Sequence, residues 1–118
     1  MNEVLVVDGA NVVGSVPDGW WRDRRGAAER LRDRLVEHAE RTGSEVILVV
    51  EGAARGVESV PGVRVESADG SGDDRIVEIV AGLSGQPCTV VTADRELRGR
   101  VAELGARCVG PRTVRGER

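Results

Sequence analysis

Short runs of branched apolar residues alternate with amphipathic segments along this chain, and that alternation limits the folds it can adopt. The clearest run, VLVV, occupies Val4–Val7 and stops at a carboxylate, Asp8. Because its apolar residues are continuous rather than alternating with polar ones, such a strand is expected to be covered on both faces. Strands of this kind separated by helices are typical of an α/β sandwich. We therefore predict an α/β fold around one mostly parallel sheet.

The same pattern predicts five strands and three helices. The strands follow the apolar runs, at Val4–Val7, Val46–Val50, Val63–Val65, Val90–Thr92 and Arg107–Val109. The helices follow apolar residues spaced three to four apart, at Arg24–Arg41, Asp73–Leu83 and Arg95–Leu104. Val63–Val65 is the weakest strand, because only Gly52–Gly62 connect it to the strand before it and a parallel crossover usually takes about a dozen residues or more.

Composition excludes several classes of enzyme and of location. The chain of 118 residues has no Lys, so a Walker-type phosphate loop and a Schiff-base enzyme are both excluded. Its start, MNEVLVV, carries no basic leader, and its longest apolar run, Val46–Val50, is too short to span a bilayer. We expect a soluble cytoplasmic protein without membrane contact.

Acidic residues follow the predicted strands at the edge of the sheet where α/β proteins carry their sites. They are Asp8, Glu51, Asp73, Asp74 and Asp94. Carboxylates crowded into one crevice repel one another, and a divalent cation among them relieves that repulsion. Hard oxygen ligands suit Mg²⁺ or Mn²⁺. We predict that Asp8, Asp73, Asp74 and Asp94 hold such an ion, with Glu51 in possible support.

Each acid also has a purely structural explanation, which the sequence leaves open. Asp8 could begin a turn with the glycine after it, and Asp94 could cap the helix that follows it. Asp73 and Asp74 could serve the start of their helix, and Glu51 could be a solvated loop residue. Helical spacing places Asp73 on the side that faces the sheet and Asp74 at its rim.

Two neutral polar residues join this group. Asn11 is predicted to take part in catalysis by orienting a carboxylate or holding a water, and its alternative is a turn amide that bonds its own backbone. Thr92 could support the site by bonding Asp94 or a phosphate oxygen, and its alternative is plain β-propensity.

Basic and aromatic residues gather in the loop after the first strand. Guanidinium groups bind phosphates and exposed indoles stack on unpaired bases, which favours single-stranded RNA as the partner. The predicted RNA contacts are Trp20, Trp21, Arg22, Arg24, Arg25 and Arg95. The alternative is structural: the arginines could pair with Asp18, Asp23 and Glu29, and at least one Trp is expected to be buried.

The ordered segments VVDGANVVGS, VVEG, GDDRIVEIV and VVTADRELRGRVAELGA resemble the NYN (YacP-type) domains of the PIN-like nuclease superfamily. The resemblance implies a three-layer sandwich with strand order 3-2-1-4-5 over residues 1–111. The polar residues after this domain predict a flexible tail over residues 112–118. It also implies a metal-dependent ribonuclease whose carboxylates match Asp8, Asp73, Asp74 and Asp94. Such an enzyme would use Mg²⁺ or Mn²⁺ and leave a 5′-phosphate.

The sequence departs from the family pattern at the edges of this site. Glu51 stands where relatives often have Asp, Ala10 where they often have Tyr, and SGDD replaces the more usual TADD. Two other functions stay open: a non-catalytic module that binds RNA or protein, and a metal-dependent phosphohydrolase of small molecules, which a homodimer could complete.

Overall fold

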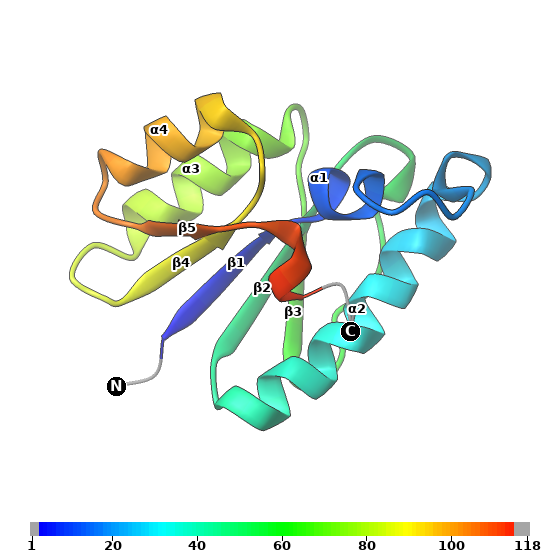
Figure 1. The fold of residues 1–118 in the computed structure, drawn as a ribbon, viewed down its shortest axis with the longest axis horizontal. Helices are drawn as coiled ribbons and strands as arrows, with labels where there is room; N and C mark the ends of the chain where they lie inside the picture. Colours follow the sequence, from blue (N-terminus) through cyan, green and yellow to red (C-terminus); the bar gives the residue numbers. More distant parts are fainter. Residues whose placement is uncertain (1–2, 115–118) are drawn as a thin grey trace.

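Five parallel strands form one sheet in the order β3-β2-β1-β4-β5 (Figure 1). The structure is a computed structural model, and it describes residues 3–114. The strands are β1 Val4–Asp8, β2 Glu45–Val50, β3 Val63–Ser67, β4 Cys88–Val91 and β5 Arg107–Val109. The predicted α/β class and strand order are confirmed, and the sheet is parallel throughout rather than mostly so.

Helices cover both faces of the sheet and make three layers. The long α2 lies on one face, and α3 and α4 lie together on the other (Figure 1). The helices are α1 Gly9–Gly14, α2 Arg24–Thr42, α3 Gly72–Gly82 and α4 Arg95–Ala102. Short 3₁₀ turns follow the same order, at η1 Trp20–Arg22, η2 Gly52–Ala54 and η3 Pro111–Thr113.

The core consists of two apolar layers, because side chains along each strand alternate between the faces. On β1, Leu5 and Val7 face the layer that includes Leu31 and Leu35 of α2. The intervening residues face α3 and α4, where the buried side chains include Val4, Val6, Ile76, Val80, Leu97 and Val101. Burial on both faces explains why the strands read as continuous apolar runs.

The crossover from β2 to β3 is short, yet it is well anchored. Val57 is buried in the α2-side layer, 4% exposed, although it lies in a loop. The Arg32 guanidinium of α2 donates to the Glu58 carbonyl at 3.0 Å, and the Gly56 N–H donates to the Ser67 hydroxyl at 2.9 Å. These contacts tie the crossover to α2 and β3. The weakest predicted strand, Val63–Val65, is therefore formed, and as β3 it extends to Ser67.

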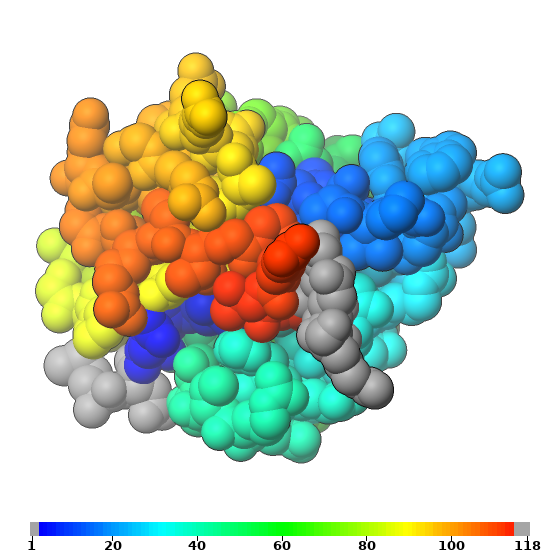
Figure 2. Space-filling model, viewed as in Figure 1, coloured from blue at the N-terminus to red at the C-terminus, as the bar shows by residue number. Residues whose placement is uncertain are grey.

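The packed part of the chain extends past the predicted domain boundary at residue 111. The η3 turn carries Val114 into the α2-side layer, where it is 4% exposed. Figure 2 shows the η3 segment, in red, next to the blue-green C-terminal part of α2. The flexible tail predicted for 112–118 is therefore wrong for residues 112–114, and residues 115–118 lie outside the described part.

No helix among the described residues is both long enough and apolar enough to cross a bilayer.

Candidate active site

Asp8 ends β1 and is buried, only 5% exposed, at the carboxyl edge of the sheet. Its Oδ2 accepts a hydrogen bond from the Thr92 hydroxyl at 2.9 Å, and its Oδ1 accepts one from the Asn11 N–H at 3.3 Å. The second bond makes Asp8 the N-cap of α1. Asp8 thus caps a helix instead of beginning a turn with Gly9, which was its structural alternative, and it also bonds the residue that follows β4.

The pKa of Asp8 is raised from its ordinary 3.8 to about 6, mainly by burial and to a smaller extent by the nearby carboxylates of Asp73 and Glu51. The hydrogen bonds from Thr92 and Asn11 act in the opposite direction, because they favour the charged form. The buried anion is therefore held at a cost in free energy that its two donors offset only in part.

Asp73 and Asp74 lie at the start of α3 and face different surroundings. Ser71 caps the helix by accepting from both of their N–H groups, at 3.1 Å and 3.4 Å. Burial raises the pKa of Asp73, and the charges of Asp94 and Glu51 raise it further. Asp74 is exposed and accepts from the Arg100 guanidinium at 3.1 Å. The expected orientation is confirmed: Asp73 faces the other acids, and Asp74 stands at the rim.

Asp94 is the N-cap of α4, as its structural explanation required. Its Oδ1 accepts from the Leu97 N–H at 3.0 Å, and its own N–H donates to the Thr92 hydroxyl at 3.1 Å. Thr92 is completely buried and so links the backbone of Asp94 to the side chain of Asp8. We expected Thr92 to bond Asp94 or a phosphate, and its bond to Asp8 was not foreseen.

The Asn11 side chain connects α1 with the β4–α4 loop rather than orienting a carboxylate. Its Oδ1 accepts from the Ala93 N–H at 2.9 Å, which fixes α1 against the β4–α4 loop. Neither predicted role of the amide describes this contact, because the bond joins residues 82 apart in sequence. The hydrogen bond from Asn11 to Asp8 comes from its backbone N–H.

Glu51 is tied to α3 by a contact that the sequence did not indicate. Its Oε1 accepts from the Gly72 N–H at 3.0 Å, at the N-terminus of the helix that carries Asp73. A Cβ at Gly72 would lie 2.3 Å from this oxygen, so the Glu51 carboxylate would have to move away if any other residue stood there. Glu51 is thus held in the site rather than being a freely solvated loop residue.

Carboxylates from four segments therefore act on one another at this edge, and they are the residues that could hold a metal. Among residues 3–114, however, no three acidic, His or Cys side chains are already grouped closely enough to hold an ion together. Magnesium commonly takes one or two carboxylates and completes its shell with waters and substrate phosphates. The oxygen-only donor set and its mutual repulsion fit that mode of binding.

The loop after α1 presents aromatic and basic side chains beside this edge and protrudes from the body of the molecule (Figure 2). Trp20 and Trp21 meet edge to face with ring centroids 5.9 Å apart. The guanidinium carbons of Arg22 and Arg24 lie 5.8 Å and 5.3 Å from the ring centres of Trp21 and Trp20. Trp21 is 54% exposed and Trp20 is half-buried, so neither is buried in the way that we expected of at least one Trp.

The remaining predicted RNA contacts differ in what they touch. Arg25 donates to the carbonyls of Arg55 and Gly56, at 3.2 Å and 3.1 Å, and thereby braces the β2–β3 crossover. Arg95 is exposed at the start of α4. The structural alternative holds for Glu29, which lies 3.9 Å from the Arg25 guanidinium, whereas Asp23 pairs with no arginine within residues 3–114 and caps α2 by accepting from the Gly26 N–H at 3.0 Å.

Comparison with known proteins shows the fold directly. Two crystal structures of Rae1 (YacP) from Bacillus subtilis superpose with TM-scores of 0.81, for a W164L mutant, and 0.80. The match covers 97% and 92% of this chain and 72% and 69% of theirs, at 23% and 24% identity. The chain has the YacP fold. This chain and Rae1 (YacP) share the five-stranded sheet, whose strand order is the one that the resemblance to NYN domains implied.

No family model matches the chain. Three UPF0178 proteins from Xanthomonas oryzae pv. oryzae are 38% identical to it over 95 residues. These 95 residues are 78% of this chain and 56% of each relative, so the chain spans little more than half the length of the curated relatives it matches.

Proposed function

We propose that this chain is a metal-dependent ribonuclease that hydrolyses phosphodiester bonds of single-stranded RNA. One observation carries the proposal: four acids from separate segments lie close enough for their charges to interact through Asp73. They are Asp8, Glu51, Asp73 and Asp94. Folding alone gains nothing from this meeting, because the charges raise the pKa of both Asp8 and Asp73. A cluster of acids that destabilises the protein is a candidate functional site.

The acids fit a divalent cation by their chemistry, since all are oxygen donors with net negative charge. Asp8 and Asp73 would be its principal ligands, with Asp94 and Asp74 completing the set. An Mg²⁺ or Mn²⁺ ion there would neutralise the charge of the phosphate and lower the pKa of a water.

The chain's own residues position that chemistry. Thr92 and Asn11 hold the two oxygens of Asp8 in fixed directions, and the Ser71 cap fixes the first turn of α3, which carries Asp73. Neither a histidine nor a nucleophilic side chain is needed. Since Asp94 uses one oxygen to cap α4, its other oxygen remains for a ligand or a water.

Substrate would approach over the loop that carries the exposed cations. Arg22 and Arg24 lie over indole rings and form no hydrogen bond or ion pair within residues 3–114, so their guanidinium groups are available to phosphates. Trp21 offers an exposed face for stacking on a base, and Arg95 offers a cation beside Asp94. Arg25 is a weaker candidate, because its donors already bind two carbonyls.

Two comparisons support the same function. The motifs resemble NYN domains, for which the resemblance implies ribonuclease activity, and the fold is that of Rae1 (YacP). The two remaining alternatives make different predictions. A binding module would retain RNA without cutting it, and a small-molecule phosphohydrolase would act on free nucleotides in preference to RNA.

The test is cleavage of end-labelled single-stranded RNA by the purified protein in Mn²⁺ or Mg²⁺. We expect products with a 5′-phosphate, no cleavage with a chelator, and no cleavage by Asp8→Asn or Asp73→Asn. Glu40→Gln is the matched control, because it removes one charge from an exposed position on α2, away from the acids. Undiminished cleavage by both aspartate variants would reject the proposal.

A further inference from the structure

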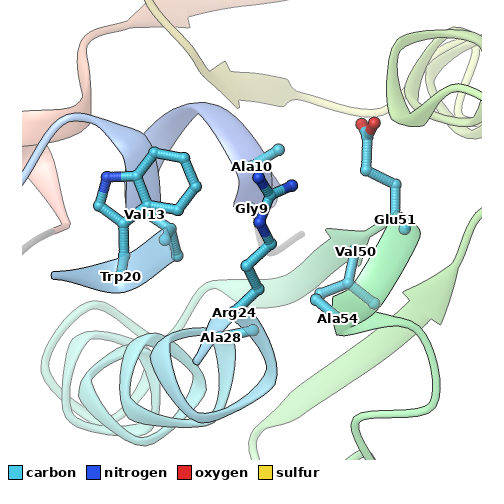
Figure 3. A pocket seen from close by; sticks show the side chains of 10 residues that line it. Gly9, Ala10, Val13, Trp20, Arg24, Ala28, Val50, Glu51 and Ala54 are labelled. Carbon is cyan, nitrogen blue, oxygen red and sulfur yellow. The ribbon is translucent and has the colours of Figure 1, made fainter. Parts of the chain in front are cut away.

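A small pocket adjoins the acidic edge and is not used by the chemistry proposed above. It has a volume of about 160 Å³ and lies between the start of α1, the first turns of α2 and the end of β2 (Figure 3). Glu51 belongs to both places, since it lines the pocket and also binds the Gly72 N–H beside Asp73. A group in this pocket would therefore sit next to the carboxylates.

The walls of the pocket suit a flat apolar group. Small side chains leave it open, namely those of Ala10, Ala28 and Ala54, and the indole of Trp20 forms one wall. Its volume is about half the ~300 Å³ at which pockets for drug-sized ligands begin, so it has room for one ring system and not for a whole nucleotide.

Two charged side chains line the pocket and have polar groups that remain available to a ligand. In Figure 3 the Arg24 side chain lies between Trp20 and Glu51. Arg24 forms no ion pair or hydrogen bond within residues 3–114, and its guanidinium carbon lies 5.3 Å from the centre of the Trp20 ring. Glu51 uses Oε1 for Gly72, while its Oε2 accepts no hydrogen bond in the same range. A cation and an acceptor are thus both available beside an aromatic wall.

We propose that this pocket holds one unpaired nucleobase of the RNA, stacked on Trp20, with its N–H groups donating to Glu51. The inference rests on the proposed ribonuclease function, because it places the base beside the phosphate to be cut. Because the Arg24 side chain lies between Trp20 and Glu51, its guanidinium must swing outward to admit the base, and there it can pair with the sugar-phosphate chain that leaves the pocket. Stacking on an aromatic ring is worth about 1–3 kcal/mol per base in single-stranded complexes.

The carboxylate also sets an order among the bases. Guanine presents two adjacent donors, N1–H and the N2 amino group, which a carboxylate can accept together. Uracil presents one donor between two carbonyl oxygens, and a carboxylate repels those oxygens. Base edges left without partners lower the affinity strongly in such sites. The pocket is therefore expected to bind guanine more tightly than uracil.

The test measures binding without cleavage, by amide and indole NMR signals in the presence of a chelator. The probes are guanosine 5′-monophosphate, uridine 5′-monophosphate and ribose 5-phosphate. We expect the guanosine nucleotide to shift the signals of Ala10, Ala54 and Trp20, the uridine nucleotide to bind several-fold more weakly, and ribose 5-phosphate to leave them unchanged. Shifts as large with ribose 5-phosphate as with the guanosine nucleotide would overturn the inference.

Two neighbouring alanines give a matched pair of variants. Ala54→Leu fills the pocket and should weaken binding of the guanosine nucleotide about tenfold or more. Ala53→Leu adds the same volume at an exposed position outside the pocket and should leave the affinity within about twofold. Equal affinities of these two variants would refute the pocket as the binding site.

Glu51→Gln keeps an acceptor for Gly72 and needs no room, so it serves even if Ala54→Leu does not fold. It should remove the preference for guanosine over uridine, and a preserved preference would contradict the role of Glu51. The two proposals can fail separately. Nucleotide binding without any RNA cleavage rejects the ribonuclease and keeps the pocket, whereas cleavage without nucleotide-dependent shifts rejects the pocket alone.

Discussion

Replacing Asp8 by asparagine should make the metal-free protein more stable at neutral pH, although it should abolish activity. Asp8 is 5% exposed, and its pKa rises to about 6, mainly through burial. The folded protein therefore binds a proton at Asp8 more tightly than the unfolded chain does. Asparagine is nearly the same size and carries no charge, so it removes the cost of burying the anion.

The pH window follows from the two pKa values of Asp8, about 6 when folded and 3.8 ordinarily. Below 3.8 the carboxyl is protonated in both states and costs nothing. As pH rises toward 6, only the unfolded chain loses the proton freely, so the free energy of unfolding of the native protein falls. The cost is complete above pH 6, at about 3 kcal/mol, and about 2 kcal/mol of it appears between pH 4.5 and 7.5.

Urea unfolding in a chelating buffer at these two pH values measures the effect. Because the change in hydrogen bonding to Thr92 and Asn11 is the same at both, it cancels from the difference. We expect the stability of Asp8→Asn relative to the native protein to be about 2 kcal/mol greater at pH 7.5 than at pH 4.5. Asp18→Asn, at an exposed loop position, should show no such change. A pH-independent difference for Asp8→Asn would refute the reasoning.

Three further substitutions test contacts that hold the site and the fold. Thr92→Val removes the hydroxyl that donates to Asp8 and accepts from the Asp94 N–H, and thermal unfolding should show a loss of about 1–3 kcal/mol. Gly72→Ala places a Cβ 2.3 Å from the Glu51 Oε1, so it should cost about 1–2 kcal/mol and, in the NMR titration, lower the guanosine preference. Val114→Ala opens a cavity in the α2-side layer and should cost about 1–3 kcal/mol in urea.

Each of these substitutions has a matched control substitution that should change the stability little. Thr92→Ser keeps the hydroxyl. Gly82→Ala adds a Cβ with nothing within 4 Å and should be neutral or stabilise α3 by up to about 1 kcal/mol. Thr113→Ala changes an exposed side chain and should stay within about 0.5 kcal/mol. Equal losses from Gly72→Ala and Gly82→Ala, or from Val114→Ala and Thr113→Ala, would contradict the contacts assigned here.

The sheet could be predicted because burial on both faces leaves a continuous apolar signal. The continuous apolar runs predicted strands covered on both faces at Val4–Val7 and Val46–Val50, and both are buried in the structure. The acids that follow these runs mark where each strand leaves the core. Helical spacing also gave the inward direction of Asp73 and the outward direction of Asp74, since both lie on one regular helix.

Short elements could not be predicted, because they have no period to detect. The six residues of α1 include two glycines and two valines, and the helix depends on its cap from Asp8. Val114 is one apolar residue in a polar stretch, and only the fold shows that it completes a core layer.

Contacts between residues far apart in the sequence could not be predicted either. The bond of Asn11 to Ala93 and that of Glu51 to Gly72 each depend on the sheet bringing loops together. The glycine in SGDD was a hint, because a residue without a side chain at a helix N-terminus leaves room for another group.

Titration with Mn²⁺ by calorimetry tests most directly whether the separated acids act as one site. The native protein and Glu40→Gln should bind the ion alike, while Asp8→Asn and Asp73→Asn should each weaken binding about tenfold or more. The double variant should lose less than the sum of the two single losses, because both carboxylates serve the same ion. Binding that is unchanged in both single variants would contradict the account.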